Sequence, residues 1–225
     1  MPRKPAAPED LSAKKALALE VIARLKKEYP DAACTLDYDH AWQLLVSVRL
    51  AAQCTDARVN IVVEDLFAKY PSVAALAAAE PEEIEAIVKP CGLGHSKARD
   101  ISACMRMLRD EYDCKVPTTF EELLSLPGVG RKSANLIMGD VFGKPAIVTD
   151  THCIRLCNKI GLVDGIKEPQ KVEMALWKII PPEEGSDLCH RFVMHGRAVC
   201  NARKPECEKC CLRDICRYAR ENAAT

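Results

Sequence analysis

The chain has 225 residues, of which 48% are hydrophobic and 28% are charged, with 32 basic and 32 acidic side chains. This length can bury the core of one large domain or two small ones, and the composition is that of a globular protein. No stretch approaches the roughly 18 apolar residues of a membrane span. The basic N-terminus has no apolar run behind it, which excludes a secretory signal. We therefore expect a soluble, intracellular protein.

Helices are favoured over strands, because aromatic residues make up only 5% of the chain while alanine and leucine are abundant. No strand alternation and no long-period repeat is present, so the predicted fold class is all-α. The apolar run Trp42–Ala52 fits a buried helix, and a central strand is the competing interpretation. The predicted helices, in chain order, are Leu11–Tyr29, Trp42–Ala52, Thr55–Tyr70, Ser72–Ala79, Pro81–Val88, Ser96–Tyr112, Thr118–Leu126, Arg131–Phe142, Thr151–Ile160, Glu168–Ile180 and Gly185–Val199.

The turn Leu126-Pro-Gly-Val-Gly-Arg-Lys-Ser-Ala134 lies between two predicted helices. Gly128 and Gly130 allow positive φ and leave backbone N–H groups uncovered. Together with the N-terminus of the next helix, these groups suit one DNA phosphate. A plain turn between two helices has the same residue preferences. A nucleotide P-loop is excluded, because Ser125 stands where that motif needs glycine and a helix precedes the turn.

Lys132 and Asp150 are the candidate reactive residues. Lys132 falls in the first turn of a helix, where the helix dipole disfavours a cation. Burial and the neighbouring Arg131 would also favour a neutral, nucleophilic amine, and a solvated lysine that contacts phosphate is the alternative. Asp150 precedes the next helix, 18 positions later, where a carboxylate is a good N-cap.

Four of the 13 cysteines form the compact motif Cys200-x6-Cys207-x2-Cys210-x5-Cys216. An intracellular chain uses such cysteines for metal ligation in preference to disulfides. By ligand count, the set suits a tetrahedral zinc ion and a [4Fe–4S] cluster equally. From Cys189 onward, basic residues exceed acidic ones by four, which fits a phosphate-facing surface or a merely solvated one.

These motifs together resemble the endonuclease III family of helix–hairpin–helix DNA glycosylases. The matching segments are Ala52-Gln-Cys-Thr-Asp56, Cys91-Gly-Leu-Gly-His-Ser-Lys-Ala98, Leu126–Lys132, Asp150-Thr-His152 with Arg155, and the four cysteines, so the resemblance runs from about Leu11 to Cys216. It implies a two-lobed helical fold. One lobe would be a six-helix barrel over residues 34–144, and the other would combine residues 1–33 with residues 145–225.

The resemblance also implies a bifunctional repair enzyme for double-stranded DNA that holds damaged pyrimidines or abasic sites. Lys132 would attack C1′ of a flipped nucleotide and form a Schiff base, with Asp150 as carboxylate partner. Gln53 would fill the gap in the duplex and Leu93 would wedge neighbouring bases apart. The cysteines Cys200, Cys207, Cys210 and Cys216 would hold a [4Fe–4S] cluster. Further DNA contacts are assigned to Gly128, Val129, Gly130, Arg131, His152, Arg203, Lys204 and Lys209.

The sequence departs from the family pattern at Ala51, Cys54 and Gly94-His95, which affects the lesion preference and leaves the chemistry intact. One alternative is the related adenine glycosylase for mispairs, which usually lacks the lysine and carries a further C-terminal domain. The other is a non-catalytic DNA-binding protein with a structural zinc ion. We expect a monomer in the cytoplasm, associated with the nucleoid if the protein is bacterial.

Overall fold

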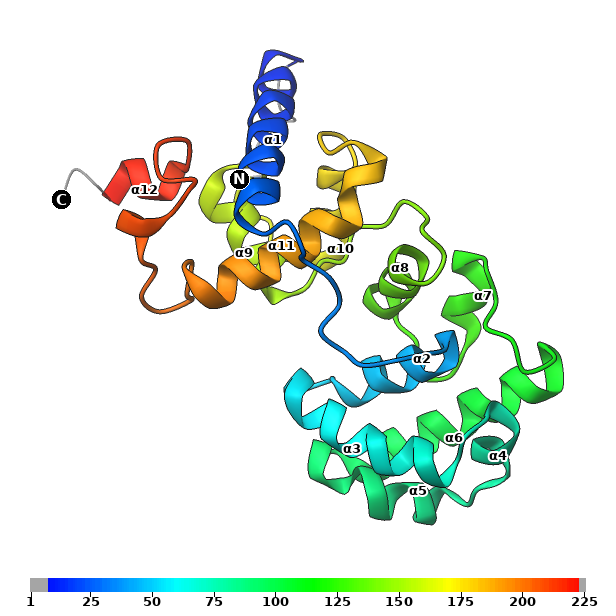
Figure 1. Ribbon diagram of the computed structural model, residues 1–225. Coiled ribbons are helices and arrows are strands. Elements are labelled where there is room, and N and C mark those ends of the chain that lie inside the picture. Colours follow the sequence, from blue (N-terminus) through cyan, green and yellow to red (C-terminus); the bar gives the residue numbers. More distant parts are fainter. Residues whose placement is uncertain (1–7, 223–225) are drawn as a thin grey trace. The chain divides into compact units, whose positions relative to one another are not determined.

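The computed structural model describes residues 8–222, and all of its regular elements there are helical, which confirms the all-α prediction (Figure 1). None of the helices in this range combines the length and the hydropathy that a membrane crossing requires. Residues 1–7, which include most of the basic N-terminal segment, lie outside the described residues. The α-helices are α1 (Pro8–Glu28), α2 (Ala41–Leu50), α3 (Asp56–Lys69), α4 (Val73–Ala78), α5 (Pro81–Val88), α6 (Gly94–Glu111), α7 (Phe120–Ser125), α8 (Arg131–Asp140), α9 (Thr151–Ile160), α10 (Pro169–Leu176), α11 (Gly185–Ala198) and α12 (Arg217–Asn222).

Three short 3₁₀ helices complete the described elements. They are η1 (Lys89–Cys91), η2 (Pro182–Glu184) and η3 (Cys207–Lys209). Backbone contacts divide the chain into two compact units. The first unit, Cys34–Gly143, contains α2 to α8, and the second combines the described parts of Met1–Ala33 and Lys144–Thr225.

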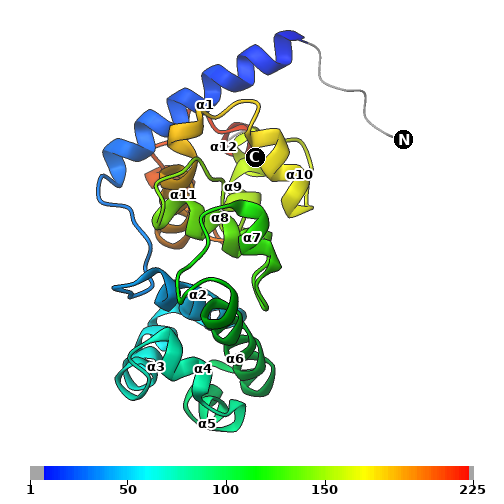
Figure 2. The same ribbon diagram turned by 90° about the vertical axis from the view of Figure 1, so that its right-hand side faces the viewer.

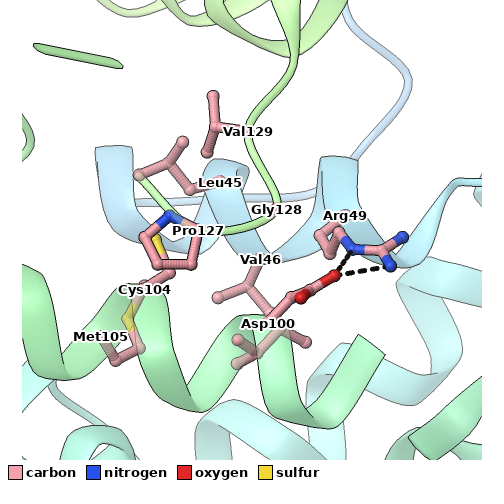
Figure 3. Close-up of a pocket in the computed structure, with 10 residues that line it drawn as sticks. Leu45, Val46, Arg49, Asp100, Cys104, Met105, Pro127, Gly128 and Val129 are labelled. Carbon is pink, nitrogen blue, oxygen red and sulfur yellow. Dashed lines mark hydrogen bonds and ion pairs between the residues drawn. The ribbon is translucent and has the colours of Figure 1, made fainter. Parts of the chain in front are cut away.

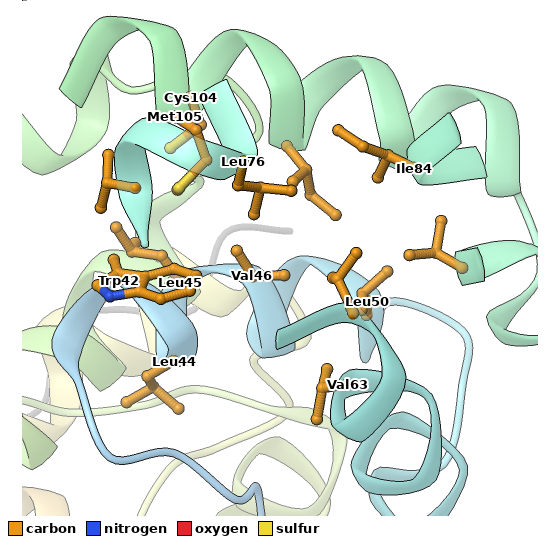
Figure 4. Close-up of a cluster of buried hydrophobic side chains, with 14 of the residues drawn as sticks. Trp42, Leu44, Leu45, Val46, Leu50, Val63, Leu76, Ile84, Cys104 and Met105 are labelled. Atoms are coloured by element: carbon orange, nitrogen blue, oxygen red, sulfur yellow. The ribbon is translucent and has the colours of Figure 1, made fainter. Parts of the chain in front are cut away.

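The core of the Cys34–Gly143 unit is built around α2. Seven of the ten α2 residues are buried, so this apolar run forms a helix covered on several sides and the strand alternative is wrong. Figure 4 shows Val46 and Leu50 of α2 facing Leu76 of α4 and Ile84 of α5. Each fully buried leucine or isoleucine of this kind stabilises the fold by about 1.5–3 kcal/mol. Residues next to α2 are therefore attached to the most firmly packed part of the unit.

Local side-chain caps explain where several helices begin. The hydroxyls of Thr55, Ser72 and Thr119 accept hydrogen bonds from backbone N–H groups three residues later, at 3.4, 3.1 and 3.3 Å. Such caps satisfy N–H groups that have no partner within the helix. The predicted helix starts near these residues are confirmed. The short helix α12, which follows the last cysteine of the motif, was not predicted from the sequence.

In the second unit, α11 is the central helix. It packs against α1 and α9, and Figure 2 shows α1 running across this part of the chain. Val21 and Leu25 of α1, Leu156 of α9 and Phe192 of α11 are fully buried. The N-terminal helix is thus part of the same core as the segments from α9 to α12, although more than 100 residues separate them in the sequence.

Asp164, in the loop after α9, joins three segments of this unit. Its carboxylate pairs with Lys14 of α1 and with Arg217 of α12. Arg217 also donates from Nη2 to the carbonyl oxygen of Asn158 at 2.7 Å, at the end of α9. Burial tends to raise the pKa of Asp164, but the hydrogen bonds from Lys14 and Arg217 outweigh it and lower the pKa below its usual value.

We predict that Asp164→Asn lowers the free energy of unfolding at pH 7 by about 1 kcal/mol, because the side chain is about one-third exposed and both pairs are partly screened. A depressed carboxyl pKa stabilises the fold above the unfolded-state value near 3.9 and loses that effect as pH falls through the folded-state pKa. Urea unfolding between pH 7 and pH 3 should therefore show a weaker loss of stability in the variant.

Asp110→Asn is the matched control. Among residues 8–222, the salt bridge of Asp110 is with Arg109 beside it in the sequence, so the same pair can form in the unfolded chain. If both variants lose the same amount of acid-range pH dependence, Asp164 does not act as a tertiary link.

Candidate functional site

The turn between α7 and α8 lies over α2 and α6. Pro127, Gly128 and Val129 line a small pocket together with Val46 and Asp100 (Figure 3). Gly128 has φ of +76°, and a Cβ there would lie 2.9 Å from Cβ of Asp100 and 3.1 Å from Cδ of Arg49. Any larger residue would be strained in its backbone and would also collide with two side chains. Both the positive φ and the lack of space for a Cβ atom therefore favour glycine at this position.

Gly130 does not use the positive φ that glycine allows. Its φ is −98°, an ordinary extended value. A Cβ at this position would meet nothing within 4 Å. Gly130 is the N-cap of α8, and its bare backbone leaves the first turn of that helix open to approach. The N–H groups of a first helical turn lack partners within the helix and bind anions.

Arg49 and Asp100 support the turn from below. Nε and Nη2 of Arg49 both lie 2.7 Å from Oδ2 of Asp100, which links α2 to α6 (Figure 3). The same guanidinium reaches Ser96 Oγ at 3.1 Å. Because Gly128 packs on both side chains, this ion pair determines how closely the turn can approach α2 and α6. This pair was not predicted, because Arg49 and Asp100 are 51 positions apart in the sequence.

Lys132 lies in the first turn of α8 and its side chain is exposed. The hypothesis that burial favours its neutral form is therefore wrong for the free protein. Arg131, the preceding residue, lies over the ring of Phe120 at 5.1 Å from the ring centroid. Val129 donates its backbone N–H to the carbonyl of Leu126 at 3.1 Å, so that group is used within the turn.

Gln53 and Leu93 occupy two exposed loops of the same unit. Both residues have left-handed backbone, with φ of 57° for Gln53 and 52° for Leu93. Non-glycine residues hold this conformation only where the surrounding structure imposes it. The Leu93 side chain is 56% exposed, and Gln53 is exposed as well. Exposed side chains on strained loops are a common arrangement for binding.

A buried lysine lies beneath these two loops. The Nζ atom of Lys97 donates to the carbonyl oxygens of Leu50 and Cys91, both at 2.8 Å, and the side chain has no exposed surface. Lys97 had no predicted role. It occupies the same face of α6 as Ile101 and Met105, at a spacing of four residues, which was a usable sign of burial.

Asp150 is the N-cap of α9, as predicted. Its Oδ1 accepts a hydrogen bond from the backbone N–H of Cys153 at 2.7 Å, and the residue is partly exposed. The cap holds the carboxylate in a single orientation at the start of the helix. The helix N-terminus favours the negative charge there.

His152 and Arg155 connect α9 to the end of α11. Nη2 of Arg155 lies 3.1 Å from Nδ1 of His152 and donates to the carbonyl oxygens of Gly196 and Cys200, at 3.2 and 2.9 Å. A Cβ on Gly196 would fall 2.3 Å from the His152 ring. His152 is therefore a packed residue of this unit, and Arg155 attaches the first cysteine of the motif to α9.

The four predicted metal-ligating cysteines lie in the segment that connects α11 to α12. Cys200, Cys207 and Cys210 are half-buried and Cys216 is buried. Burial, with smaller contributions from the nearby thiols of Cys211, Cys200 and Cys216, raises the pKa of Cys210 to about 12. Within residues 8–222, no three His, Cys, Asp or Glu side chains form a group that could hold one metal ion.

Two nitrogen atoms lie within hydrogen-bonding distance of the sulfur of Cys210. The backbone N–H of Leu212 donates to Sγ at 3.4 Å, and Nε2 of His195 lies 3.3 Å from the same atom. His195 is buried, which lowers its pKa to about 4 and keeps the ring neutral. Its Nδ1 lies 3.1 Å from the hydroxyl of Tyr29 on the other side. His195 had no predicted role.

The basic residues of this loop are exposed, as a phosphate-binding role would need. Arg203, Lys204 and Lys209 all have exposed side chains. Lys209 is already paired with Glu206, at 2.5 Å, and this hydrogen bond lowers the pKa of Glu206. Any phosphate that binds Lys209 must therefore compete with a carboxylate.

Comparison with known proteins gives a consistent result. The profile of the HhH-GPD superfamily, described as base excision DNA repair proteins, matches residues 46–182. Endonuclease III of Synechocystis sp. is 44% identical over 207 residues, which cover 92% of this chain and 94% of the relative. A non-covalent endonuclease III–DNA complex matches with a TM-score of 0.88 at 39% identity, and covers 94% of this chain and 99% of that one. A trapped endonuclease III–DNA covalent intermediate, an estranged-adenine complex, matches with a TM-score of 0.88 at 40% identity, covering 93% and 98%.

The N-cap geometry of Asp150 leads to a stability prediction. Asp150→Ala should lower the free energy of unfolding by about 0.5–2 kcal/mol, because the N–H of Cys153 loses its partner. Asp150→Asn should cost much less, since the amide oxygen can accept the same hydrogen bond. Chemical unfolding of the two variants measures the difference. Equal losses for Ala and Asn would show that the charge, and not the cap, stabilises α9.

Proposed function

The chain belongs to the HhH-GPD superfamily of base excision DNA repair proteins and to the endonuclease III family within it, and on this premise we propose that Lys132 and Asp150 carry out its chemistry on damaged pyrimidines in duplex DNA. As a member of this family it is a DNA glycosylase and an abasic-site lyase. The endonuclease III trapped covalently on DNA, 40% identical to this chain, is the observation that most directly supports a covalent mechanism.

The proposed reaction begins with attack by the neutral Lys132 amine on C1′ of the damaged nucleotide. The bond from C1′ to the base breaks, and the base leaves with the electron pair and is protonated. Asp150 offsets the positive charge that develops at the sugar and accepts a proton from the amine. Opening of the sugar ring gives a Schiff base between Nζ and C1′. Loss of a proton from C2′ then expels the 3′ phosphate by β-elimination, and water releases the lysine.

The exposure of Lys132 sets a condition on this mechanism. An ordinary lysine is neutral in only about one molecule in 2,500 at pH 7. In the free protein, solvent reaches Lys132, so the amine has to lose water contacts when DNA binds. Lys132 lies at the N-terminus of α8 and directly after Arg131, and both neighbours carry positive charge. We propose that bound DNA supplies the remaining desolvation.

The exposed groups of the Cys34–Gly143 unit suit the binding of a deformed duplex. We propose that Gln53 and Leu93 occupy the space of the flipped nucleotide and separate its neighbours, as apolar wedges do in other DNA-bending proteins. The first turn of α8, entered through Gly128 and Gly130, would take one phosphate. Arg203, Lys204 and Lys209 of the other unit would add further phosphate contacts.

We also propose that Cys200, Cys207, Cys210 and Cys216 hold a [4Fe–4S] cluster. Four thiols, one of which accepts a hydrogen bond from the backbone N–H of Leu212, match the donors around such clusters. One zinc ion would use the same four thiolates and is the alternative that metal analysis tests.

When bound, the cluster would cross-link the loop from Cys200 to Cys216 and fix its basic residues. Arg155 would hold Cys200 from α9, and His195 would direct an N–H at Cys210. As a repair enzyme of bacterial type, the protein would act in the cytoplasm, at the nucleoid.

We predict that borohydride traps the wild-type protein covalently on duplex DNA with an abasic site, and that Lys132→Ala abolishes the adduct. Asp150→Asn should retain the cap but lower the single-turnover rate by about 10²-fold or more, because the carboxylate charge is lost. Gel analysis of the adduct and of strand cleavage measures both effects.

Lys115→Ala is the control for lysine removal, since Lys115 is exposed and, within the described part of the chain, forms its salt bridge with Asp113 on the turn after α6. An adduct that persists in Lys132→Ala, or that is equally lost in Lys115→Ala, would rule out Lys132 as the nucleophile. Failure of folded wild-type protein to form any adduct would remove the lyase mechanism altogether.

The adjacent residues Cys210 and Cys211 allow a matched test of the cluster. Cys210→Ser should lose iron and visible absorption and should lower the melting temperature. Cys211→Ser should keep all three, because the hydrogen bond from Nη1 of Arg24 is accepted by the main-chain carbonyl oxygen of Cys211, which serine retains. The iron and zinc contents of the purified proteins are the measurement. Stoichiometric zinc in a colourless wild-type protein would contradict the cluster.

A further inference from the structure

Lys97 connects the ends of two helical segments through one buried ammonium group. Leu50 is the last residue of α2 and Cys91 is the last residue of η1, and each carbonyl receives a 2.8 Å hydrogen bond from Nζ. Terminal carbonyls of helices have no partner within the helix and carry partial negative charge. The lysine thus satisfies two otherwise unpaired acceptors, and their dipoles in turn stabilise a cation that is fully out of water.

The two carbonyls lie directly before the exposed loops. Gln53 follows Leu50 by three residues, and Leu93 follows Cys91 by two. These are two of the four non-glycine residues with positive φ in the described chain. The loop around Leu93 is also closely packed, because a Cβ on Gly94 would lie 3.1 Å from Cα of Lys89. Both strained residues are therefore held within a few bonds of the same buried nitrogen.

Lys97 has no acidic partner that would explain it as an ion pair. Among residues 8–222, no Asp or Glu forms a salt bridge with it, and its hydrogen bonds go to main-chain oxygens alone. Burial lowers its pKa, which means that the fold loses stability by keeping this group charged. An apolar side chain on the apolar face of α6 would avoid that cost. The carbonyl contacts are what an apolar side chain could not provide.

We propose that Lys97 is a positioning residue for base extrusion, which sets the spacing and orientation of Gln53 and Leu93 by fixing the main chain before each of them. This inference rests on the proposed function, since it assumes that these two side chains enter the duplex. Without the ammonium group, each loop would still exist, but the two side chains would no longer be held in register. The rate of base release, which requires extrusion of a base, would then fall more than the rate of strand cleavage at an abasic site.

Lys97→Met removes the donors while keeping an apolar stem of similar length. Single-turnover rates are measured on two duplexes that differ only at one position, which holds either thymine glycol or an abasic site. We expect base release to slow by about 10- to 100-fold, the scale of a small misplacement. Strand cleavage at the abasic site should change by less than about threefold. Fluorescence of 2-aminopurine placed beside the lesion should show less unstacking.

Leu108→Ala is the control, because Leu108 is fully buried on the same helix, 11 residues further on. It should lower the melting temperature and leave the ratio of the two rates unchanged. If Lys97→Met fails to fold, Lys97→Leu takes its place, since it also removes the N–H donors and keeps an apolar side chain. Deuterium exchange should also become faster at residues 50–54 and 91–94 in the Lys97 variant, but not in Leu108→Ala.

An unchanged rate ratio in a folded Lys97 variant, or the same change in Leu108→Ala, would overturn the positioning role. A wild-type protein that cleaves neither duplex would instead contradict the proposed function. The two failures are therefore distinguishable in one set of assays.

Discussion

The first two turns of α6 make the contacts on which the exposed loops of the Cys34–Gly143 unit depend. Lys97 holds the main chain before Gln53 and Leu93, and Asp100 holds Arg49 beneath Gly128. A buried charge without hydrogen bonds would destabilise the fold by several kcal/mol, so the position of the ammonium is tightly constrained by its two acceptors. Three loops that are far apart in sequence thus take their geometry from one helix. Their relative placement is fixed before any DNA arrives, which reduces the entropy lost on binding.

In the other unit, α9 has a comparable role. It begins at Asp150, whose carboxylate is held by the cap, and one turn later Arg155 reaches the carbonyl of Cys200. The candidate acid and the first cysteine of the motif are therefore attached to the same rigid segment. An ordered cysteine loop would therefore also restrain α9 through the contact between Cys200 and Arg155, and α9 is the helix that positions Asp150.

The features that could be predicted from the sequence are those that depend on interactions between residues close together in the chain. The helix starts at Thr55, Ser72 and Thr119 and the cap at Asp150 follow from side chains that reach backbone groups three residues away. Features that depend on residues distant in sequence were missed or misjudged. Gly128 and Gly130 look alike in the sequence, yet only Gly128 is confined, because Arg49 and Asp100 lie beneath it.

Lys97 shows where a prediction was possible but was not made. A lysine within Gly-His-Ser-Lys-Ala-Arg-Asp looks like part of a solvated helix start. Its spacing from Ile101 and Met105 places it on the buried face, and an unexplained charge on such a face indicates a specific partner. The exposure of Lys132 had no comparable sign, because it depends on what packs around the first turn of α8.

The two candidate reactive groups share one physical feature, since each stands at a helix N-terminus. The dipole of α8 acts against the charge of Lys132, and the dipole of α9 acts in favour of the charge of Asp150. The proposed chemistry needs a neutral amine and an ionised acid, so each helix terminus has the polarity that the reaction requires. Because Lys132 is exposed in the free protein, bound DNA has to exclude water from the amine before it can attack. The proposed nucleophile is therefore placed by the first turn of α8, and its activation belongs to the complex with DNA.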